Sequence, residues 1–109
     1  MLIKKRIIEG KGIKFSREIN RKEIARAFLY ILHNDLHKQP FGFLEDDFVD
    51  ESFRGKGIGT AILNKVMKEA KKQRCYKIVA TSRYSRPEAH RLYKRLCFKD
   101  WGKEFRLDL

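Results

Sequence analysis

The sequence predicts a mixed α/β fold, built as one layered domain over residues 1–109. The first half is divided by Gly, Asn and Pro into short strand-like runs without long helical periodicity. The second half contains two stretches whose apolar residues recur at helical spacing. The expected order is therefore strands, helix, strand, helix and a last strand, and a chain of this length can bury an ordinary core without disulfide bonds.

The first half is expected to form two hairpins. Residues 2–9 and 13–19 read as strands joined across Gly10-Lys11-Gly12, and Asn20-Arg21 separates the second of these strands from residues 23–32. Both alternating sides of residues 23–32 are largely apolar, which is typical of a central strand, with a helix as the alternative.

The rest of the chain is expected to alternate strand and helix. Residues 41–50 mix aromatic and acidic side chains and should form a strand that leads into a glycine-rich loop. Residues 60–73 place apolar side chains at helical spacing with lysines between them, so this helix should cover the sheet. Residues 76–82 read as a buried strand and residues 87–96 as a second helix, and apolar residues that alternate over 105–109 predict a last strand.

The chain is strongly basic, with 26 basic and 14 acidic residues and a formal net charge of +12. Such a charge permits nucleic-acid binding, because Lys and Arg neutralise phosphates. The basic residues are spread along the whole chain, however, and no aromatic-basic nucleic-acid motif is recognisable. Abundant Lys, Arg, Glu and Ile with few Asn and Gln also fit a protein selected for heat. A nucleic-acid partner is therefore not expected.

The sequence predicts a cytoplasmic protein without a metal. Cys75 and Cys97 form no C-x-x-C pair and are expected to be free thiols in a reducing compartment. We expect no membrane partner, because no apolar run reaches membrane-spanning length and no leader follows Met1. His33 and His37 are four residues apart but fall in an expected loop, so no metal site is expected.

The most informative motif is the glycine-rich loop Arg54-Gly55-Lys56-Gly57-Ile58-Gly59-Thr60. Glycine permits positive φ, so the backbone amides can turn toward one anion. The start of the following helix and the two basic side chains add positive potential. The loop lacks the Gly-Lys-Ser/Thr ending of a Walker A motif. By itself it predicts only a phosphate site, or a mobile turn that leads into a helix.

Residues 49–60, Val-Asp-Glu-Ser-Phe-Arg-Gly-Lys-Gly-Ile-Gly-Thr, closely resemble the central motif of the GNAT superfamily of acetyl-CoA-dependent N-acetyltransferases. Residues 86–98 resemble the closing helix and strand start of the same superfamily. The resemblance implies a GNAT-like mixed, mainly antiparallel sheet flanked by helices. It also implies acetyl-CoA as the cosubstrate, bound by residues 54–60, by the backbone at Phe48 and Val49, and by Arg86.

The N-terminal half is shorter than the resemblance implies. GNAT domains usually place two helices between their first and second strands, and those helices help to enclose the acceptor. Here Gly10-Lys11-Gly12 is the only candidate connection. We therefore expect an acceptor side that is open, or that a second subunit completes in a homodimer.

Acetyl transfer to an amine needs a base that removes a proton from the amine. Residues 43–49, Phe-Leu-Glu-Asp-Asp-Phe-Val, resemble the Leu-Glu-Asp-x-Phe-Val strand of polyamine (spermidine/spermine) acetyltransferases. The resemblance implies that Glu45 and Asp46 bind and deprotonate the amine, with Glu45 as the first candidate for the base. The local concentration of acids in a basic chain adds Asp47 to the expected amine site. Strand alternation would separate Asp46 from the other two acids, but a bulge is usual in this GNAT strand and leaves their shared face open. The alternative is that these acids only pair with nearby Lys and Arg.

Tyr93 resembles the superfamily tyrosine that protonates the leaving thiolate. Helical spacing alone would instead place it in the apolar stripe of its helix. Arg86 stands where many relatives have an asparagine, and Cys97 replaces the usual glycine before Phe98. These departures make the fit of the coenzyme at that corner a question for the structure.

The sequence therefore predicts an N-acetyltransferase that moves an acetyl group from acetyl-CoA directly to a primary amine in a ternary complex. The acceptor is expected to be cationic, such as a polyamine, an amino sugar or an exposed protein amine. The alternative is a module that binds coenzyme A or nucleic acid without catalysis, which the net charge and the short acceptor side favour.

Overall fold

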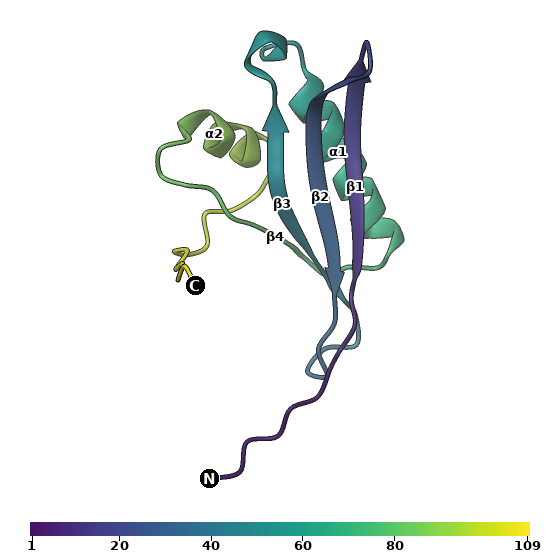
Figure 1. The fold of residues 1–109 in the computed structure, drawn as a ribbon, viewed down its shortest axis with the longest axis vertical. Coiled ribbons are helices and arrows are strands. Elements are labelled where there is room, and N and C mark those ends of the chain that lie inside the picture. Colours follow the sequence, from purple (N-terminus) through teal and green to yellow (C-terminus); the bar gives the residue numbers. More distant parts are fainter.

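The computed structural model describes residues 1–109, which form one four-stranded sheet with two helices (Figure 1). The elements are β1 (Lys11–Ile19), β2 (Lys22–Leu32), β3 (Phe41–Val49), a single 3-10 turn (Glu51–Phe53), α1 (Ile58–Lys72), β4 (Ile78–Ala80) and α2 (Pro87–Arg95). The strands lie in the order β1-β2-β3-β4, with antiparallel pairing among the first three and parallel pairing between β3 and β4. This topology confirms the mixed, mainly antiparallel sheet with a shortened N-terminal half.

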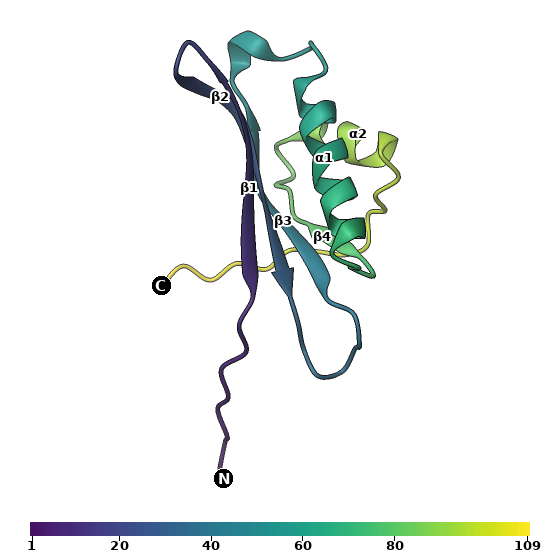
Figure 2. The ribbon, with the colours of Figure 1, turned by 90° about the vertical axis from the view of Figure 1, so that its right-hand side faces the viewer.

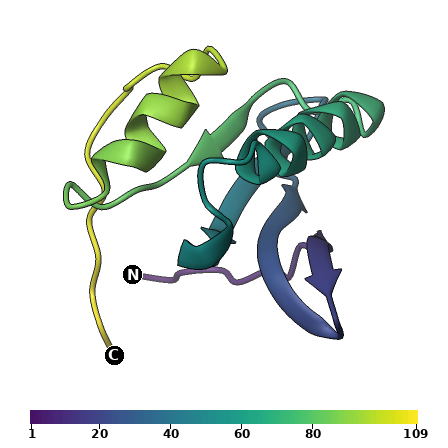
Figure 3. The ribbon, with the colours of Figure 1, turned by 90° about the horizontal axis from the view of Figure 1, so that it is seen from above.

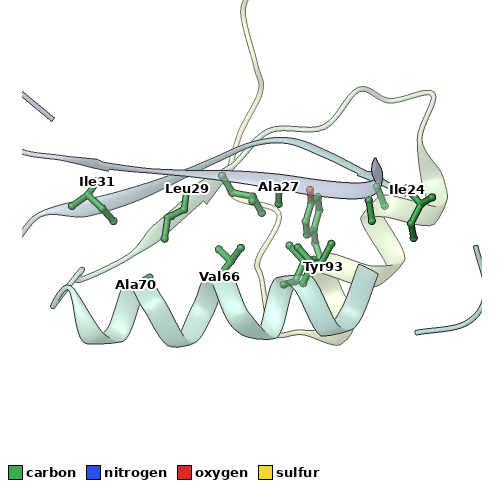
Figure 4. Close-up of a cluster of buried hydrophobic side chains, with 12 residues drawn as sticks. Ile24, Ala27, Leu29, Ile31, Val66, Ala70 and Tyr93 are labelled. Carbon is green, nitrogen blue, oxygen red and sulfur yellow. The ribbon is translucent and has the colours of Figure 1, made fainter. Parts of the chain in front are cut away.

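Both helices lie on the same side of the sheet (Figures 2 and 3). The side chains of β2 that face them are buried and alternate along the strand, as a strand with one covered face requires. The core between this face and α1 contains Ala25, Ala27, Leu29, Ile31, Leu44, Ile62, Leu63, Val66 and Ala70, several of which are labelled in Figure 4. We call this side of the sheet the covered face. Neither helix is long and apolar enough to cross a membrane.

The other side of the sheet, which we call the open face, carries aromatic and basic side chains. Arg26, Phe28 and Tyr30 alternate with the buried residues of β2, and Tyr30 remains 38% exposed. The rings of Phe28 and Tyr30 stack at 6.3 Å, and the Arg26 guanidinium lies 4.7 Å from the ring of Phe48. The strand was therefore predicted correctly. Only one of its two apolar sides is buried, because no helix lies over the second side (Figure 3).

Residues 2–9 were expected to pair with the next strand, and this prediction is wrong. The segment leads away from the start of β1 instead of folding back on it, and its apolar side chains are exposed (Figure 1). Arg6 pairs there with Asp35 of the β2–β3 loop at 2.9 Å. Gly10 packs so closely on the end of β2 that a Cβ would meet the Ile31 oxygen at 2.9 Å. The chain thus runs past the sheet, where no strand is available to pair with it.

The strand expected at residues 105–109 is also absent, and the strand expected at residues 76–82 shortens to Ile78–Ala80. Phe105, Leu107 and Leu109 are exposed and belong to no strand. An alternating segment becomes a strand only where an edge offers unpaired backbone groups, and the edge strand β4 has only three residues. The other elements end within a few residues of their expected bounds, as helix and strand ends commonly do.

A bulge interrupts β3 opposite Ala27. Phe28 pairs with Glu45 and Arg26 pairs with Phe48, so two residues of β3 stand opposite one residue of β2. Asp46 adopts φ of 47°, in the left-handed region that Asp tolerates better than most residues. The bulge moves the residues that follow it by one position relative to strict alternation.

Candidate functional site

A groove opens where β3 and β4 diverge. The two strands pair only over Gly42–Leu44 and Ile78–Ala80, so the second half of β3 has β2 on one side and no strand on the other (Figure 1). The groove there has a volume of about 780 Å³. Its walls are Asp47, Phe48 and Val49 of β3, the glycine-rich loop, the first turn of α1, and α2 with the residues that precede it.

The glycine-rich loop presents the start of α1 to this groove. Gly55 and Gly57 have φ of 77° and 82°, and nothing lies within 4 Å of a Cβ built on either, so their value is conformational. Gly57 caps α1 without a side-chain hydrogen bond, and the first helical hydrogen bond runs from the Ala61 amide to the Gly57 oxygen. The amides of Ile58, Gly59 and Thr60 therefore have no partner within the helix and can meet an anion.

Arginines surround the same groove. Arg54, Arg86, Arg91 and Arg95 all line it. Arg54 Nε donates to the Val49 oxygen at 2.9 Å, which fixes the loop to the end of β3, and Arg95 donates to Thr60 Oγ1 at 3.3 Å, which links the two helices. Guanidinium groups bind phosphate through paired hydrogen bonds, so this wall suits a polyphosphate ligand.

The groove residue Asp47 carries a carboxylate that is hydrogen-bonded to a phenol. The Tyr93 hydroxyl donates to Asp47 Oδ2 at 3.1 Å, and the Arg86 guanidinium approaches the Asp47 carbonyl oxygen at 3.4 Å. Tyr93 is only 9% exposed, and its hydroxyl points toward the sheet (Figure 4). Asp47 lines the groove, and the hydrogen bond holds the Tyr93 hydroxyl next to that wall.

Burial changes the proton affinity of both groups. Burial raises the pKa of Asp47, and the hydrogen bond from Tyr93 and the charge of Arg86 oppose that rise. The pKa of Tyr93 is also raised, first by burial and then by the negative charge of Asp47 and its hydrogen bond. Each group favours its protonated form more than it would in water, which is the property of a site that holds and moves protons.

The acids of β3 do not act as one cluster. Glu45 pairs with Phe28 across the strands and lies on the open face, whereas Asp47 lies on the covered face with Tyr93. Burial raises the pKa of Glu45, and its acidic neighbours Asp46 and Glu104 raise it further. Asp50 has a local role, because its carboxylate accepts from the Ser52 amide at 3.0 Å at the start of the 3-10 turn.

The predicted acetyl-CoA residues line the groove with one exception. Lys56 lies outside it, with its ammonium 5.6 Å from the ring of Phe53. Of the predicted amine-site residues, Asp47 lines the groove and Glu45 and Asp46 do not. No three of the His, Cys, Asp and Glu side chains lie together in a way that could hold a metal ion.

Arg91 and Arg95 are groove residues that the sequence analysis missed. They are four apart in α2, so they share one side of the helix and flank its apolar stripe. Helical spacing could have identified them once the stripe containing Tyr93 was turned toward the sheet. The signal was weak because basic residues occur throughout this chain.

Cys97 occupies the backbone conformation for which related proteins usually have glycine. It has φ of 70°, directly after the end of α2, where its amide donates to the Lys94 oxygen and the Phe98 amide donates to the Tyr93 oxygen at 2.9 Å. This is the left-handed helix ending that glycine normally fills. The chain keeps the turn with a strained cysteine, and the rings of Tyr93 and Phe98 still pack at 5.4 Å.

The fold and the groove together define an acetyltransferase-like domain with an anion-binding loop. The acetyltransferase (GNAT) family matches residues 10–98, and the chain belongs to this family. The family uses acetyl-CoA as its cosubstrate, and the unpaired amides and the arginines of the groove fit that ligand.

The matches to individual relatives cover only part of each relative's length. The glucosamine 6-phosphate N-acetyltransferase of Trypanosoma brucei brucei is 35% identical over 69 residues, which are 62% of this chain and 44% of that protein. An uncharacterised N-acetyltransferase of Methanocaldococcus jannaschii is 34% identical over 67 residues, 62% of this chain and 30% of that protein. The crystal structure of an acetyltransferase from Trypanosoma brucei has a TM-score of 0.78 and 26% identity, covering 90% of this chain and 69% of the other. The chain thus spans less than half the length of the two sequence relatives.

Proposed function

We propose that this chain is a cytoplasmic N-acetyltransferase that moves an acetyl group from acetyl-CoA to a primary amine by direct transfer in a ternary complex. The observation that carries the proposal is the groove, which joins unpaired helix-start amides and arginines at one end to a carboxylate–phenol pair at the other. The whole of residues 1–109 would act as one acetyltransferase domain.

The donor site would use residues that line the groove. The pyrophosphate of acetyl-CoA would lie on the amides of the glycine-rich loop and the first turn of α1, with Arg54 and Arg91 beside it. The amide groups of the coenzyme arm would pair with the free side of β3 at Phe48 and Val49, as an added strand does. Arg86 stands at the entrance to the carboxylate–phenol pair, where it can reach either a phosphate or the Asp47 backbone.

The acceptor would be a cationic amine drawn to the acidic end of β3. Glu45, Asp46 and Asp47 supply negative charge in an otherwise basic chain, and an alkylammonium must lose a proton before it attacks the thioester. The likeness to the polyamine acetyltransferase strand favours a polyamine. The name of the Trypanosoma brucei brucei relative favours a phosphorylated amino sugar instead.

A homodimer is part of the proposal, because the open face carries stacked aromatic rings with no helix over them. A second copy on that face would complete the acceptor side. Sedimentation of the active protein tests this, and an active species that is strictly monomeric contradicts it.

Thermal unfolding with acetyl-CoA tests the donor site. Acetyl-CoA at a hundred times its dissociation constant should add about 2.7 kcal/mol to the stability, a shift of several degrees for a small domain. Arg91→Gln should reduce the shift, and Lys5→Gln, which removes the same charge from the N-terminal segment, should not. An unchanged melting temperature with acetyl-CoA, together with salt-sensitive binding to DNA, would favour the nucleic-acid alternative.

Turnover with a panel of amines then tests the acceptor. The panel contains spermidine, glucosamine 6-phosphate and a lysine peptide, each assayed with the wild type, Glu45→Gln and Tyr93→Phe. Loss of turnover in Glu45→Gln at unchanged acetyl-CoA binding would support Glu45 as the base. Equal turnover in all three proteins would remove both assigned residues and leave the donor site standing.

A further inference from the structure

We propose that Asp47 and Tyr93 act as one proton-transfer pair, in which Asp47 takes a proton from the attacking amine and Tyr93 gives a proton to the leaving sulfur. This inference rests on the proposed acetyl transfer. It gives Asp47 the catalytic part that the resemblance assigned to Glu45.

The position of Asp47 follows from the bulge in β3. Without the bulge, strict alternation would put Asp47 on the open face with Glu45. The two residues opposite Ala27 instead place Asp47 on the covered face, where its carboxylate accepts the Tyr93 hydroxyl at 3.1 Å. Asp47 lines the groove, and its hydrogen bond holds the Tyr93 hydroxyl within 3.1 Å of this wall residue, so both groups are available to a reacting centre there.

Glu45 is less well placed for this chemistry. It lies on the open face opposite Phe28 and does not line the groove. Its negative charge can still attract a cationic acceptor, and it contributes to the field that Tyr93 experiences. Its part in the pair is therefore electrostatic.

The chemistry balances within the pair. The neutral amine forms a bond to the thioester carbon, and the carbonyl electrons move to oxygen. Asp47 takes the extra N–H proton, the C–S bond breaks with its electron pair on sulfur, and Tyr93 donates its O–H proton to that sulfur. The proton on Asp47 then returns to the Tyr93 oxygen through their hydrogen bond, so both residues are restored. The earlier proton of the ammonium form leaves to solvent.

The distance between the two oxygens allows the pair to contact the amine nitrogen and the leaving sulfur at the same time. Nitrogen and sulfur are bonded to the same carbon in the tetrahedral intermediate, so they are about a hydrogen-bond length apart. The two oxygens of the pair have a similar separation, 3.1 Å. One oxygen can therefore face the nitrogen while the other faces the sulfur.

The charges around the pair make the two transfers depend on each other. The negative charge of Asp47 raises the pKa of Tyr93, while Arg86 lowers it and Glu45 raises it. When Asp47 takes the amine proton, its negative charge disappears and Tyr93 becomes a stronger acid at the moment sulfur needs a proton. Burial raises the pKa of Asp47, which makes it a better base than an ordinary aspartate.

Steady-state kinetics with Asp47→Asn, Tyr93→Phe and the double variant test the pair. Each single variant should lose about 100-fold or more in kcat, with little change in the KM for acetyl-CoA, and the double variant should be no worse than either. Asp35→Asn and Tyr76→Phe make the same chemical changes far from the groove and should keep wild-type turnover. Asp47→Glu should recover part of the activity that Asp47→Asn loses. Losses that multiply in the double variant would overturn the pair.

The leaving group provides a second readout that a structural role would not move. Acetyl thioesters of more acidic thiols need less protonation at sulfur, so Tyr93→Phe should approach the wild-type rate on them, whereas Asp47→Asn should keep the deficit that comes from the lost base. A deficit in Tyr93→Phe that is the same for every thiol would overturn its link to sulfur. No turnover by the wild type with any amine would defeat the acetyl transfer itself.

Titration of tyrosinate absorbance needs no substrate. It therefore distinguishes a failure of the Asp47–Tyr93 pair from a failure of the proposed acetyl transfer. Asp47→Asn should move the Tyr93 titration to lower pH, because it removes the negative charge beside the phenol. Tyr93→Phe identifies which part of the absorbance change belongs to that residue. An unchanged Tyr93 titration in Asp47→Asn would overturn the pair even if the wild type transfers acetyl groups.

Discussion

The two faces of the sheet differ more than their sequences do. β2 supplies Leu29 and Ile31 to the covered face and Phe28 and Tyr30 to the open face, and both sets are apolar. The first set is buried under α1, whereas Tyr30 stays 38% exposed and stacks on its neighbour. Apolar periodicity thus identifies a strand that could be covered twice, and the number of covering layers depends on which helices the chain provides.

The same division separates the acids of β3 by task. Glu45 lies on the open face, where an approaching cation meets it, and Asp47 lies on the covered face, where it meets Tyr93. One short acidic run therefore serves two sides of the sheet. The following changes test how different the two faces are.

Truncation of a core residue on the covered face should have the largest effect. Leu63 is fully buried between α1 and the sheet, so Leu63→Ala should cost about 2–5 kcal/mol in the free energy of unfolding. Tyr30→Ala on the open face should cost about 1 kcal/mol or less in the monomer. Urea denaturation of both variants at low protein concentration measures the difference. A loss at Tyr30 as large as that at Leu63 would mean that a second copy covers the open face, as the proposed homodimer requires.

Relief of strain at the end of α2 should have a smaller effect of opposite sign. An L-residue in the left-handed region costs about 1–2 kcal/mol. Cys97→Gly should therefore raise the free energy of unfolding by about 1 kcal/mol. Cys97→Ala removes the thiol and keeps the strain, so it should give no such gain. Thermal unfolding under reducing conditions measures both. An equal gain in the two variants would point to the thiol instead of the backbone.

The smallest expected effect is a difference between Asp47 and Glu45 in how their replacement changes the pH dependence of stability. The folded pKa of Asp47 is raised, so its stabilising contribution is complete below the usual aspartate pKa and is lost as pH rises through the raised value. Asp47→Asn should therefore gain stability over the wild type between acid and neutral pH. Glu45→Gln should gain in the same direction but less, since Glu45 is less buried. Melting temperatures across that range measure the effect, and a destabilised Asp47→Asn at neutral pH would show a mainly structural carboxylate.

Much of the fold could be predicted because its signals are local. The helical spacing of Ile62, Val66 and Ala70 and the glycines at 55 and 57 report on the residues that carry them. The segments at 2–9 and 105–109 have equally good strand patterns, but a strand also needs a partner edge, and a one-dimensional pattern does not report where edges lie.

The sequence predicted the proposed acetyl-CoA site better than it predicted the contact between Asp47 and Tyr93. The loop residues are contiguous in sequence, so their motif describes the anion site almost completely. Tyr93 meets Asp47 from 46 positions away, and only the GNAT resemblance indicated a bulge in this strand, because the residues themselves do not mark its position. Arg91 and Arg95 join the groove only through the orientation of α2.

The bulge at Asp46 gives this strand one residue that it can lose without a change of sides. Deleting that single codon would place Asp47 directly after Glu45, and strict alternation would keep Asp47 on the covered face and Phe48 on the open face. Deleting a codon from the regular part of the strand before Glu45 would instead move the residues before the deletion to the opposite face relative to those after it. For this gene, the loss of three bases therefore has its mildest effect on β3 at the bulge.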